Sequence, residues 1–368
     1  MNITPHSSNE LKWRELLVAL LCIILAWASK EILSIDLSDV LGEPGGAIQI
    51  AFTAPQDTQD VELSTPSIRM DQRLVELIGS ARKRAWVATF DLESESIAEA
   101  LLQAYRRGVD VRIVTDSDYL DERGASRLLA EGVAIVGDGR EAFMHNKFVV
   151  LDEDILWTGS WNLTYNGTYR NDNNVVLVKS PALVENYSLE FDEMFTRHAF
   201  GPTSPPSIPY PDIQLTGAEA RIETFFESEG NVRPRLLKLI DNSQASIHFM
   251  AFVFTDDALA DALIAAHERG VAVRGVLEGR NLRIAGSDFD RLRGAGVMVL
   301  PDGNPYAMHH KVMIFDETIV VTGSYNFTRS AAESNDENLL IIHSPYVADR
   351  YLDEFDRVWS LAQSGTGG

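Results

Sequence analysis

The chain contains one polar pattern twice, in the same order and with the same internal spacing. The pattern is His-x-Lys-x4-Asp followed by Gly-Ser-x-Asn, and the second copy begins 164 positions after the first. Its polar residues are His145, Lys147, Asp152, Ser160 and Asn162 in the first copy, and His309, Lys311, Asp316, Ser324 and Asn326 in the second. Residues 106–112 and 268–274 also match each other. Similarity at a fixed separation indicates a duplicated structural unit, so we expect two related lobes.

Each unit has the same order of expected elements. An apolar strand (85–90; 246–254) leads to an amphipathic helix (96–107; 257–269), a second strand (109–115; 271–277) and a second helix that ends at Gly132 or Gly296. Two short strands then carry the pattern (147–152 with 155–158; 311–315 with 319–322). This alternation predicts an α/β fold in which each lobe is a mixed sheet flanked by helices.

The same reading predicts the domain boundaries. At 368 residues the chain has room for two domains that each bury a core. We place the first lobe at 48–205, a proline-rich linker at 206–211, the second lobe at 212–362 and a disordered tail at 363–368.

Residues 1–47 precede the repeat and include an uncharged apolar run at 16–28. A spanning helix needs about 20 apolar residues, whereas the apolar part of a secretory signal needs roughly 7 to 15. Ala26-Trp27-Ala28 suits signal cleavage, but an uncleaved anchor stays open. We therefore expect an exported or membrane-anchored, extracytoplasmic protein. The only cysteine, Cys22, lies in this leader, so no intrachain disulfide or cysteine-based metal site is expected.

The chain is acidic, with 32 basic and 54 acidic side chains and a net charge of -22. Proteins that bind nucleic acids usually carry a basic footprint. The acidity favours solubility and argues against tight, processive binding to DNA.

The repeated residues have the chemistry of a phosphate site. A histidine and a lysine two positions apart on a strand point to one face, and the Gly-Ser turn lets the asparagine reach that face. Two copies related by a pseudo-dyad would place two imidazoles across one phosphate. Lys147, Lys311, Asn162 and Asn326 would surround its oxygens and stabilise the transition state. Because the lysines supply positive charge, no metal or cofactor is expected.

The two motifs resemble those of the phospholipase D superfamily, and the resemblance covers nearly all of the chain after the leader. It implies a two-step reaction in which one histidine forms a phosphohistidine while the other protonates the leaving oxygen and then activates water. It also implies that the first motif supplies the nucleophile, with Ser160 and Ser324 in support. Asp152 and Asp316 would be structural and point away from the phosphate.

The two copies differ 28 positions after each histidine, where the first has Asn173 and the second Glu337. In the superfamily an acidic side chain at this position commonly orients the histidine through Nδ1. We expect Glu337 to favour the imidazolium form of His309, which suits an acid, and Asn173 to leave His145 neutral as the nucleophile. Asp172 could take the place of Asn173.

The substrate is open between two classes of phosphodiester. The apolar leader and the acidic charge favour a phospholipase D that hydrolyses phospholipids. Residues 16–28 would then associate this enzyme with a membrane. The alternative is an endonuclease, because the compact lobes are similar to small single-motif bacterial nucleases and to mitochondrial cardiolipin hydrolase. A transphosphatidylase such as a cardiolipin synthase is less favoured, and a non-enzymatic binding module least. We expect a monomer whose two lobes form an internal pseudo-dimer.

Overall fold

The structure is a computed structural model that describes residues 46–55, 70–203, 208–227 and 232–365. The predicted leader, including its apolar run at 16–28 and Cys22, lies outside the described residues. Among the residues that are described, no helix is both long enough and apolar enough to cross a bilayer.

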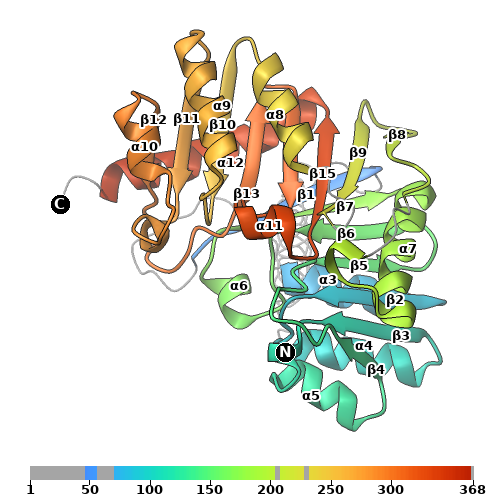
Figure 1. The fold of residues 1–368 in the computed structure, drawn as a ribbon. Helices are drawn as coiled ribbons and strands as arrows, with labels where there is room; N and C mark the ends of the chain where they lie inside the picture. The colour runs from blue at the N-terminus through green and yellow to red at the C-terminus, as the bar shows by residue number, and fades with distance from the viewer. Residues whose placement is uncertain (1–45, 56–69, 204–207, 228–231, 366–368) are drawn as a thin grey trace, which may run out of the picture. The chain divides into compact units, whose positions relative to one another are not determined.

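The first lobe is built on a mixed sheet of seven strands (Figure 1). Their order across the sheet is β1 (Ile48–Thr53), β7 (Asn173–Lys179), β6 (Ile155–Gly159), β5 (Phe148–Leu151), β2 (Arg84–Thr89), β3 (Asp110–Thr115) and β4 (Ala134–Gly137). Strands β2, β3 and β4 are parallel, and the other pairs are antiparallel. On one face lie α3 (Met70–Ser80), α4 (Glu95–Arg106) and α5 (Arg123–Ala130), and on the other lies α7 (Pro181–Arg197). The short helix α6 (Tyr165–Tyr169) follows the Gly-Ser-x-Asn turn of the first motif.

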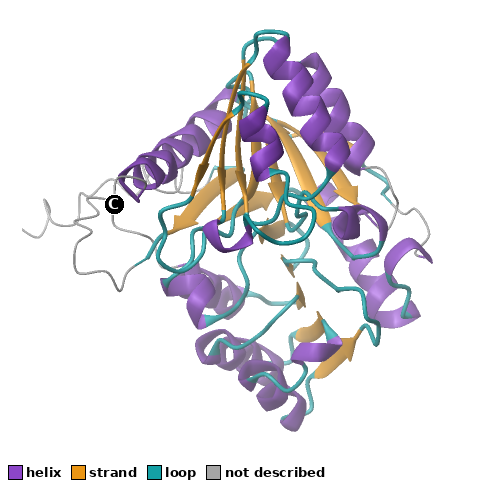
Figure 2. Ribbon diagram, turned by 60° about the vertical axis from the view of Figure 1, so that its left-hand side comes forward, coloured by secondary structure: helices purple, strands orange, loops and turns teal. Residues whose placement is uncertain are grey.

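The second lobe repeats this arrangement with an eight-stranded sheet (Figures 1 and 2). Its order is β12 (Met298–Pro301), β11 (Ala272–Leu277), β10 (Ser246–Ala251), β13 (Lys311–Phe315), β14 (Ile319–Gly323), β15 (Asn338–His343), β9 (Arg221–Phe226) and β8 (Asp212–Gln214). Helices α8 (Val232–Asn242), α9 (Asp257–Glu268) and α10 (Phe289–Gly294) pack on one face, and α12 (Pro345–Gly365) packs on the other. The short helix α11 (Arg329–Glu333) corresponds to α6. The predicted α/β class and the two-lobe repeat are confirmed.

The lobes share one hydrophobic core in addition to a core on the outer face of each sheet. The shared core joins Tyr187 of α7, Phe226 of β9 and Tyr351 of α12 with apolar residues of both sheets. Strands such as β5, with sequence Phe-Val-Val-Leu, are buried at every position because helices cover both faces of the sheet. The two lobes therefore form one packed unit, which goes beyond the two separate cores expected from chain length.

The predicted strands and helices of the repeat are present within a few residues of their expected ends. Other elements were not predicted: strands β1, β4, β7, β8, β9, β12 and β15 and helices α3, α6, α7, α8, α11 and α12. The expected disordered tail from residue 363 is wrong for its first three residues, because α12 continues to Gly365. The apolar face of α12 packs into the shared core through Val358 and Ala362, which stabilises the helix near this end.

Candidate active site

The two motif segments lie side by side because each forms backbone hydrogen bonds to the opposite lobe. The His145 N–H donates to the Asp336 carbonyl at 2.9 Å, and the His309 N–H donates to the Asp172 carbonyl at 2.8 Å. Isolated parallel bridges pair Met144 with Asp336 and Asp172 with Met308. The duplicated sequence thus produces a duplicated contact, and both motif histidines lie at the junction of the lobes.

A phenylalanine at the end of the first strand of each repeat packs against each motif. The Phe90 ring lies 5.0 Å from the His145 ring and 5.1 Å from the Lys147 ammonium. The corresponding distances from Phe252 are 4.5 Å to His309 and 5.0 Å to Lys311. These aromatic rings fix the imidazoles and stabilise the ammonium groups through cation–π contact. We did not predict a role for these two phenylalanines. Both directly follow the first strand of a repeat, and this equivalence could have identified them.

The Nδ1 partners of the two histidines are crossed between the lobes. Glu337 lies 2.8 Å from Nδ1 of His145, and the amide oxygen of Asn173 lies 2.8 Å from Nδ1 of His309. The prediction that Glu337 serves His309 and Asn173 serves His145 is therefore wrong. Asp172 forms a backbone bridge to the second motif and Asp336 forms one to the first. Asn173 and Glu337 directly follow these bridges, so each side chain contacts the histidine of the opposite lobe.

Both histidines carry their proton on Nδ1 and present Nε2 as a lone pair. Interactions with His145, Lys147 and Ser324 keep the pKa of Glu337 below its ordinary value despite burial, so Glu337 is a carboxylate that accepts from Nδ1. The Asn173 amide is oriented by its N–H donation to the Gly167 carbonyl at 3.0 Å, which leaves its oxygen facing His309. At Nε2 of His309, the Lys311 ammonium lies 3.1 Å away and can donate to the lone pair.

The environment keeps both imidazoles neutral in the ligand-free site. Burial lowers the pKa of His145 to about 4, and Glu337 offsets only part of this effect. Burial and the charges of Lys311 and Lys147 lower the pKa of His309 well below its ordinary value. A carboxylate therefore supports positive charge on His145, whereas only a neutral amide oxygen contacts Nδ1 of His309.

The two lysines are buried, and the charge of Lys147 acts on the ionisation of Lys311. Burial lowers the pKa of Lys147 to about 7, and burial together with the Lys147 charge lowers the pKa of Lys311 well below its ordinary value. Each ammonium also donates to the carbonyl of its own motif histidine, at 2.8 Å for Lys147 and 3.0 Å for Lys311. An anion placed between them would relieve the repulsion.

We expect binding of inorganic phosphate to take up protons above pH 7. The anion raises the depressed lysine pKa values, so the bound site holds more protons than the free site, and affinity should fall as pH rises through 7 and beyond. Titration calorimetry at pH 8 in two buffers of different ionisation enthalpy measures this uptake. Proton release, or affinity that rises with pH over this interval, would contradict the assignment of the lysines as the anion ligands.

The motif asparagines follow turns that only glycine can make. Gly159 and Gly323 have φ of 154° and 152°, and a Cβ at either would lie 2.2 Å from a carbonyl oxygen of the neighbouring strand. The turn leaves the Asn162 and Asn326 amide oxygens buried and without a hydrogen-bond partner among the described residues. The two lobes thus leave an acceptor unpaired at equivalent places, and only the amide N–H groups of these asparagines could donate to a phosphate oxygen.

The serines of the two turns hold the crossed Nδ1 partners. The Ser160 hydroxyl donates to the Asn173 amide oxygen at 3.0 Å, and the Ser324 hydroxyl donates to the Glu337 carboxylate at 2.6 Å. The supporting role implied by the resemblance is thus visible as hydrogen bonding. Each turn therefore fixes a residue that orients the histidine of the other lobe.

The motif aspartates are structural, as the resemblance implies. The Asp152 carboxylate accepts from the backbone N–H groups of residues 82, 83 and 84, and Asp316 accepts from those of residues 244, 245 and 246. These hydrogen bonds lower the pKa of each aspartate although burial opposes them. Both carboxylates therefore tie the start of a strand to the end of the motif strand, outside the imidazole pair.

Asp172 does not take the place of Asn173. Its carboxylate accepts from Arg357 at 2.6 Å and from Asn304 at 2.7 Å. Arg357 also pairs with Glu354, which contacts Nε2 of the fully buried His310 at 2.9 Å. This buried network joins α12 to the first lobe.

Asp91 is an acidic residue near the site that the sequence reading missed. It follows Phe90, and one of its carboxylate oxygens is buried with no hydrogen-bond partner in the described part of the chain. Burial and the neighbouring Glu122 and Glu93 raise its pKa to about 7, while Lys147 lowers it. The equivalent position after Phe252 is Val253. The surroundings of the two histidines therefore differ in charge.

Curated relatives match only part of the chain. A mitochondrial cardiolipin hydrolase from Xenopus tropicalis is 39% identical over 125 residues, which cover 34% of this chain and 60% of that protein. A phospholipase D from Rickettsia bellii is 31% identical over 172 residues, covering 47% of this chain and 85% of that protein. The chain thus spans less than two thirds of the length of the cardiolipin hydrolase.

A solved structure matches over both lobes. Phosphatidylserine synthase from Haemophilus influenzae superposes with a TM-score of 0.61 at 14% identity, covering 84% of this chain and 86% of that one, which supports the fold alone. The family model described as "Cardiolipin synthase, PLD-like domain" matches residues 74–195 and again residues 236–359. Two matches that cover more than half of the sequence, each with a complete motif, show that the chain belongs to this PLD-like domain family of the phospholipase D superfamily.

Proposed function

We propose that the protein is a phosphodiesterase that hydrolyses phospholipids through a phosphohistidine, using one active site made by both lobes. The observation that carries the proposal is the crossed pair of buried histidines, each with its Nδ1 held by the opposite lobe. At His309 the Lys311 ammonium lies 3.1 Å from Nε2. A site of this kind needs residues from both motifs. Neither lobe provides it alone.

His145 is the nucleophile in this proposal, for a reason that differs from the one expected from the sequence. Attack by Nε2 on phosphorus turns a neutral imidazole into a cation. The Glu337 carboxylate at 2.8 Å stabilises that charge, whereas the amide oxygen of Asn173 offers His309 much less. His309 then exchanges protons with the leaving oxygen and with the attacking water. The phosphate anion itself supports protonation of His309, which the empty site disfavours.

The lysines and asparagines hold the non-bridging oxygens. Lys147 and Lys311 are buried beside the motif histidines, and a bound anion favours their protonated forms. In the low dielectric of the site, the attraction between each ammonium and the anion is stronger than in water. The Asn162 and Asn326 side chains project from equivalent turns and complete a four-residue cradle. Positive charge from lysine stabilises the developing charge on phosphorus without requiring a divalent ion.

A phospholipid is the favoured substrate class because the chain is strongly acidic. The net charge of -22 and the Asp91 carboxyl beside the Lys147 motif oppose a polyanion that carries phosphates on both sides of the scissile bond. Both curated relatives described above carry names of lipid-hydrolysing enzymes. We therefore propose that this chain, too, hydrolyses the phosphodiester bonds of lipids.

We expect the purified protein to hydrolyse phospholipid vesicles in excess EDTA at an unchanged rate. The reason is that Lys147 and Lys311 supply the charge that a metal would otherwise supply. Parallel assays with single-stranded and double-stranded nucleic acid test the endonuclease alternative, and added alcohol tests transfer in place of hydrolysis. Loss of activity on chelation that a divalent ion restores would refute the lysine mechanism, and cleavage of nucleic acid alone would refute the lipid substrate.

A further inference from the structure

Arg140 of the first lobe binds the segment of the second lobe that carries Glu337. It lies five residues before His145, and its side chain is 25% exposed. The guanidinium donates to the Ser334 carbonyl at 3.2 Å and forms an ion pair with the fully buried Asp336 carboxylate. Asp336 directly precedes Glu337 in the chain. Arg140 therefore holds the residue next to the carboxylate that contacts Nδ1 of the nucleophile.

The rest of this segment is also bound to the first lobe. The Phe143 N–H donates to the side-chain oxygen of Asn335 at 3.3 Å, and the Phe143 carbonyl accepts from the Asp336 N–H at 2.9 Å. Asn335 in turn donates at 3.1 Å to the Glu337 carboxylate oxygen that does not contact His145. The loop before the nucleophile and the segment around Glu337 are therefore joined residue by residue.

The equivalent residue on the other side of the pseudo-dyad is Asn304, which is neutral. Arg140 and Asn304 each follow an Asp-Gly pair and lie five residues before a motif histidine. Asn304 donates to the Arg170 carbonyl at 3.2 Å and to the Asp172 carboxylate at 2.7 Å, so it makes the same two kinds of contact. The charge of Asp172 is balanced by Arg357, which belongs to α12. Of the two loops that precede the motifs, the one before the nucleophile thus carries the arginine.

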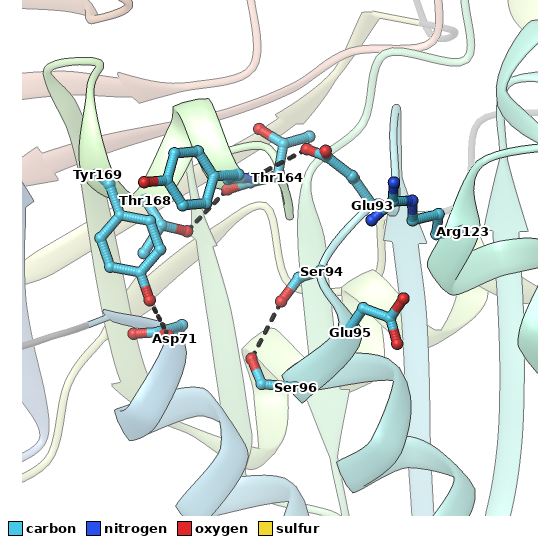
Figure 3. Close-up of a pocket in the computed structure, with 10 residues that line it drawn as sticks. Asp71, Glu93, Ser94, Glu95, Ser96, Arg123, Thr164, Thr168 and Tyr169 are labelled. Carbon is cyan, nitrogen blue, oxygen red and sulfur yellow. Dashed lines mark hydrogen bonds between the residues drawn. The ribbon is translucent and has the colours of Figure 1, made fainter.

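Asn173 has a support within its own lobe that a carboxylate cannot use. Its amide N–H donates to the Gly167 carbonyl of α6 at 3.0 Å. This helix is itself tied to α3, because the Tyr169 hydroxyl donates to the Asp71 carboxylate at 2.9 Å (Figure 3). An ionised carboxylate has no hydrogen to donate, so Glu337 cannot form the corresponding bond to α11. The exchange of amide for carboxylate therefore removes one tether from the side of the nucleophile.

The ion pair with Arg140 also keeps the Asp336 side chain in place. Burial raises the pKa of Asp336 to about 7, and Arg140 opposes this effect. Without the guanidinium, the Asp336 carboxyl would be protonated at neutral pH, and the Ser334 carbonyl would lose a donor. Removal of one partner of a buried ion pair leaves the other in an unfavourable environment. We therefore expect the segment that carries Glu337 to shift when Arg140 is lost.

We propose that Arg140 is a positioning residue for the nucleophile, because it holds Asp336 and thereby fixes Glu337 against Nδ1 of His145. The inference rests on the proposed function, in which His145 attacks phosphorus. It deepens that function by assigning the placement of a second-lobe carboxylate to an arginine of the first lobe. Arg140 acts through Asp336 and Glu337, and it lies outside the motif residues that surround the phosphate.

Arg140→Met should lower kcat by between about tenfold and 10²-fold while KM changes little. The reason is that Glu337 would no longer be aligned during the attack on phosphorus, whereas the residues that bind the phosphate would be unchanged. Kinetics of the full chain with a bis-nitrophenyl phosphodiester in EDTA measure both constants. The matched control is Arg106→Met, which removes the same charge from an exposed ion pair with Glu131 and should leave kcat unchanged.

A double-mutant cycle separates positioning from a general loss of structure. If Arg140 acts through Glu337, Arg140→Met should lower kcat by less than about threefold in the Glu337→Gln background. Losses that multiply would place the effect of Arg140 elsewhere and overturn the proposal. Arg140→Gln covers the case in which Arg140→Met does not fold, because it keeps a donor for the Ser334 carbonyl and removes the ion pair. A folded Arg140→Gln protein with the kcat of the wild type would also overturn the proposal.

Nuclear magnetic resonance measures the placement of Glu337 without any substrate. The Nδ1 proton of a histidine that donates to a carboxylate resonates at low field, and the variant His145→Ala assigns this signal. The signal should move to higher field in Arg140→Met and Arg140→Gln but stay in place in Asn304→Ala, whose loop contacts the segment of the other histidine partner.

An unchanged signal in both folded Arg140 variants would contradict the positioning role. Failure of the proposed function has a different signature, because the wild type would then hydrolyse no phosphodiester while the resonance still responded to Arg140.

Discussion

Replacing His145 with alanine should abolish both turnover and covalent labelling by substrate phosphate. Of the two motif imidazoles, the variant lacks the one whose positive charge a carboxylate stabilises, so no phosphoenzyme should accumulate. We expect activity to fall by about 10⁴-fold or more, as is typical when a nucleophile is removed. Mass spectrometry of wild-type protein quenched during turnover should place the phosphate on His145.

The matched control is His309→Ala, which removes the proton donor and the base that activates water. With a nitrophenyl phosphodiester, whose leaving group needs no protonation, this variant should form the phosphohistidine and then stall. General acid–base catalysis typically contributes about 10²–10⁴-fold, so a slow burst without turnover should be measurable. A phosphate found on His309 of the wild type would show that the two roles are reversed.

The repeat made the fold predictable, because a duplicated pattern constrains both halves at once. The strand and helix that precede each motif were located within a few residues, since their apolar periodicity is clear in both copies. Strands β1 and β9 were missed because they precede the elements that the repeat predicts in each lobe. Each also pairs with a strand more than a hundred residues away, β1 with β7 and β9 with β15. Helix α12 extends further than expected because burial against both lobes outweighs the glycine-rich end.

The site was predictable in its residues but not in its connections. The motif histidines and lysines come together as the spacing indicated. The serines hold the Nδ1 partners of the histidines, and the aspartates are structural. The place of Asn162 and Asn326 around the phosphate stays a prediction. The crossing of Glu337 and Asn173 was not visible, because spacing within one copy says nothing about which lobe a residue meets across a pseudo-dyad. Asp91 was missed for a similar reason. In the sequence it looks like any surface aspartate, and only the fold brings it close to Lys147.

Replacing Glu337 with glutamine should reduce activity strongly, by between about 10²-fold and 10⁴-fold. The amide keeps the shape of the side chain but no longer stabilises the charge that forms on His145. Because Glu337 raises the pKa of His145, its removal should also lower that pKa below about 4. Protonation of His145 at low pH inactivates the nucleophile, so the acid limb of the pH–rate profile should move to lower pH.

Asn173→Asp is the matched variant on the other side of the dyad. A carboxylate at Nδ1 of His309 should raise the pKa of that histidine and favour its protonated form. The alkaline limb of the pH–rate profile should therefore move to higher pH, with a change in maximal rate smaller than that of Glu337→Gln. The two variants affect opposite limbs because the partners are crossed. If Glu337→Gln moved the alkaline limb and Asn173→Asp the acid limb, the assignment of His145 as nucleophile would be wrong.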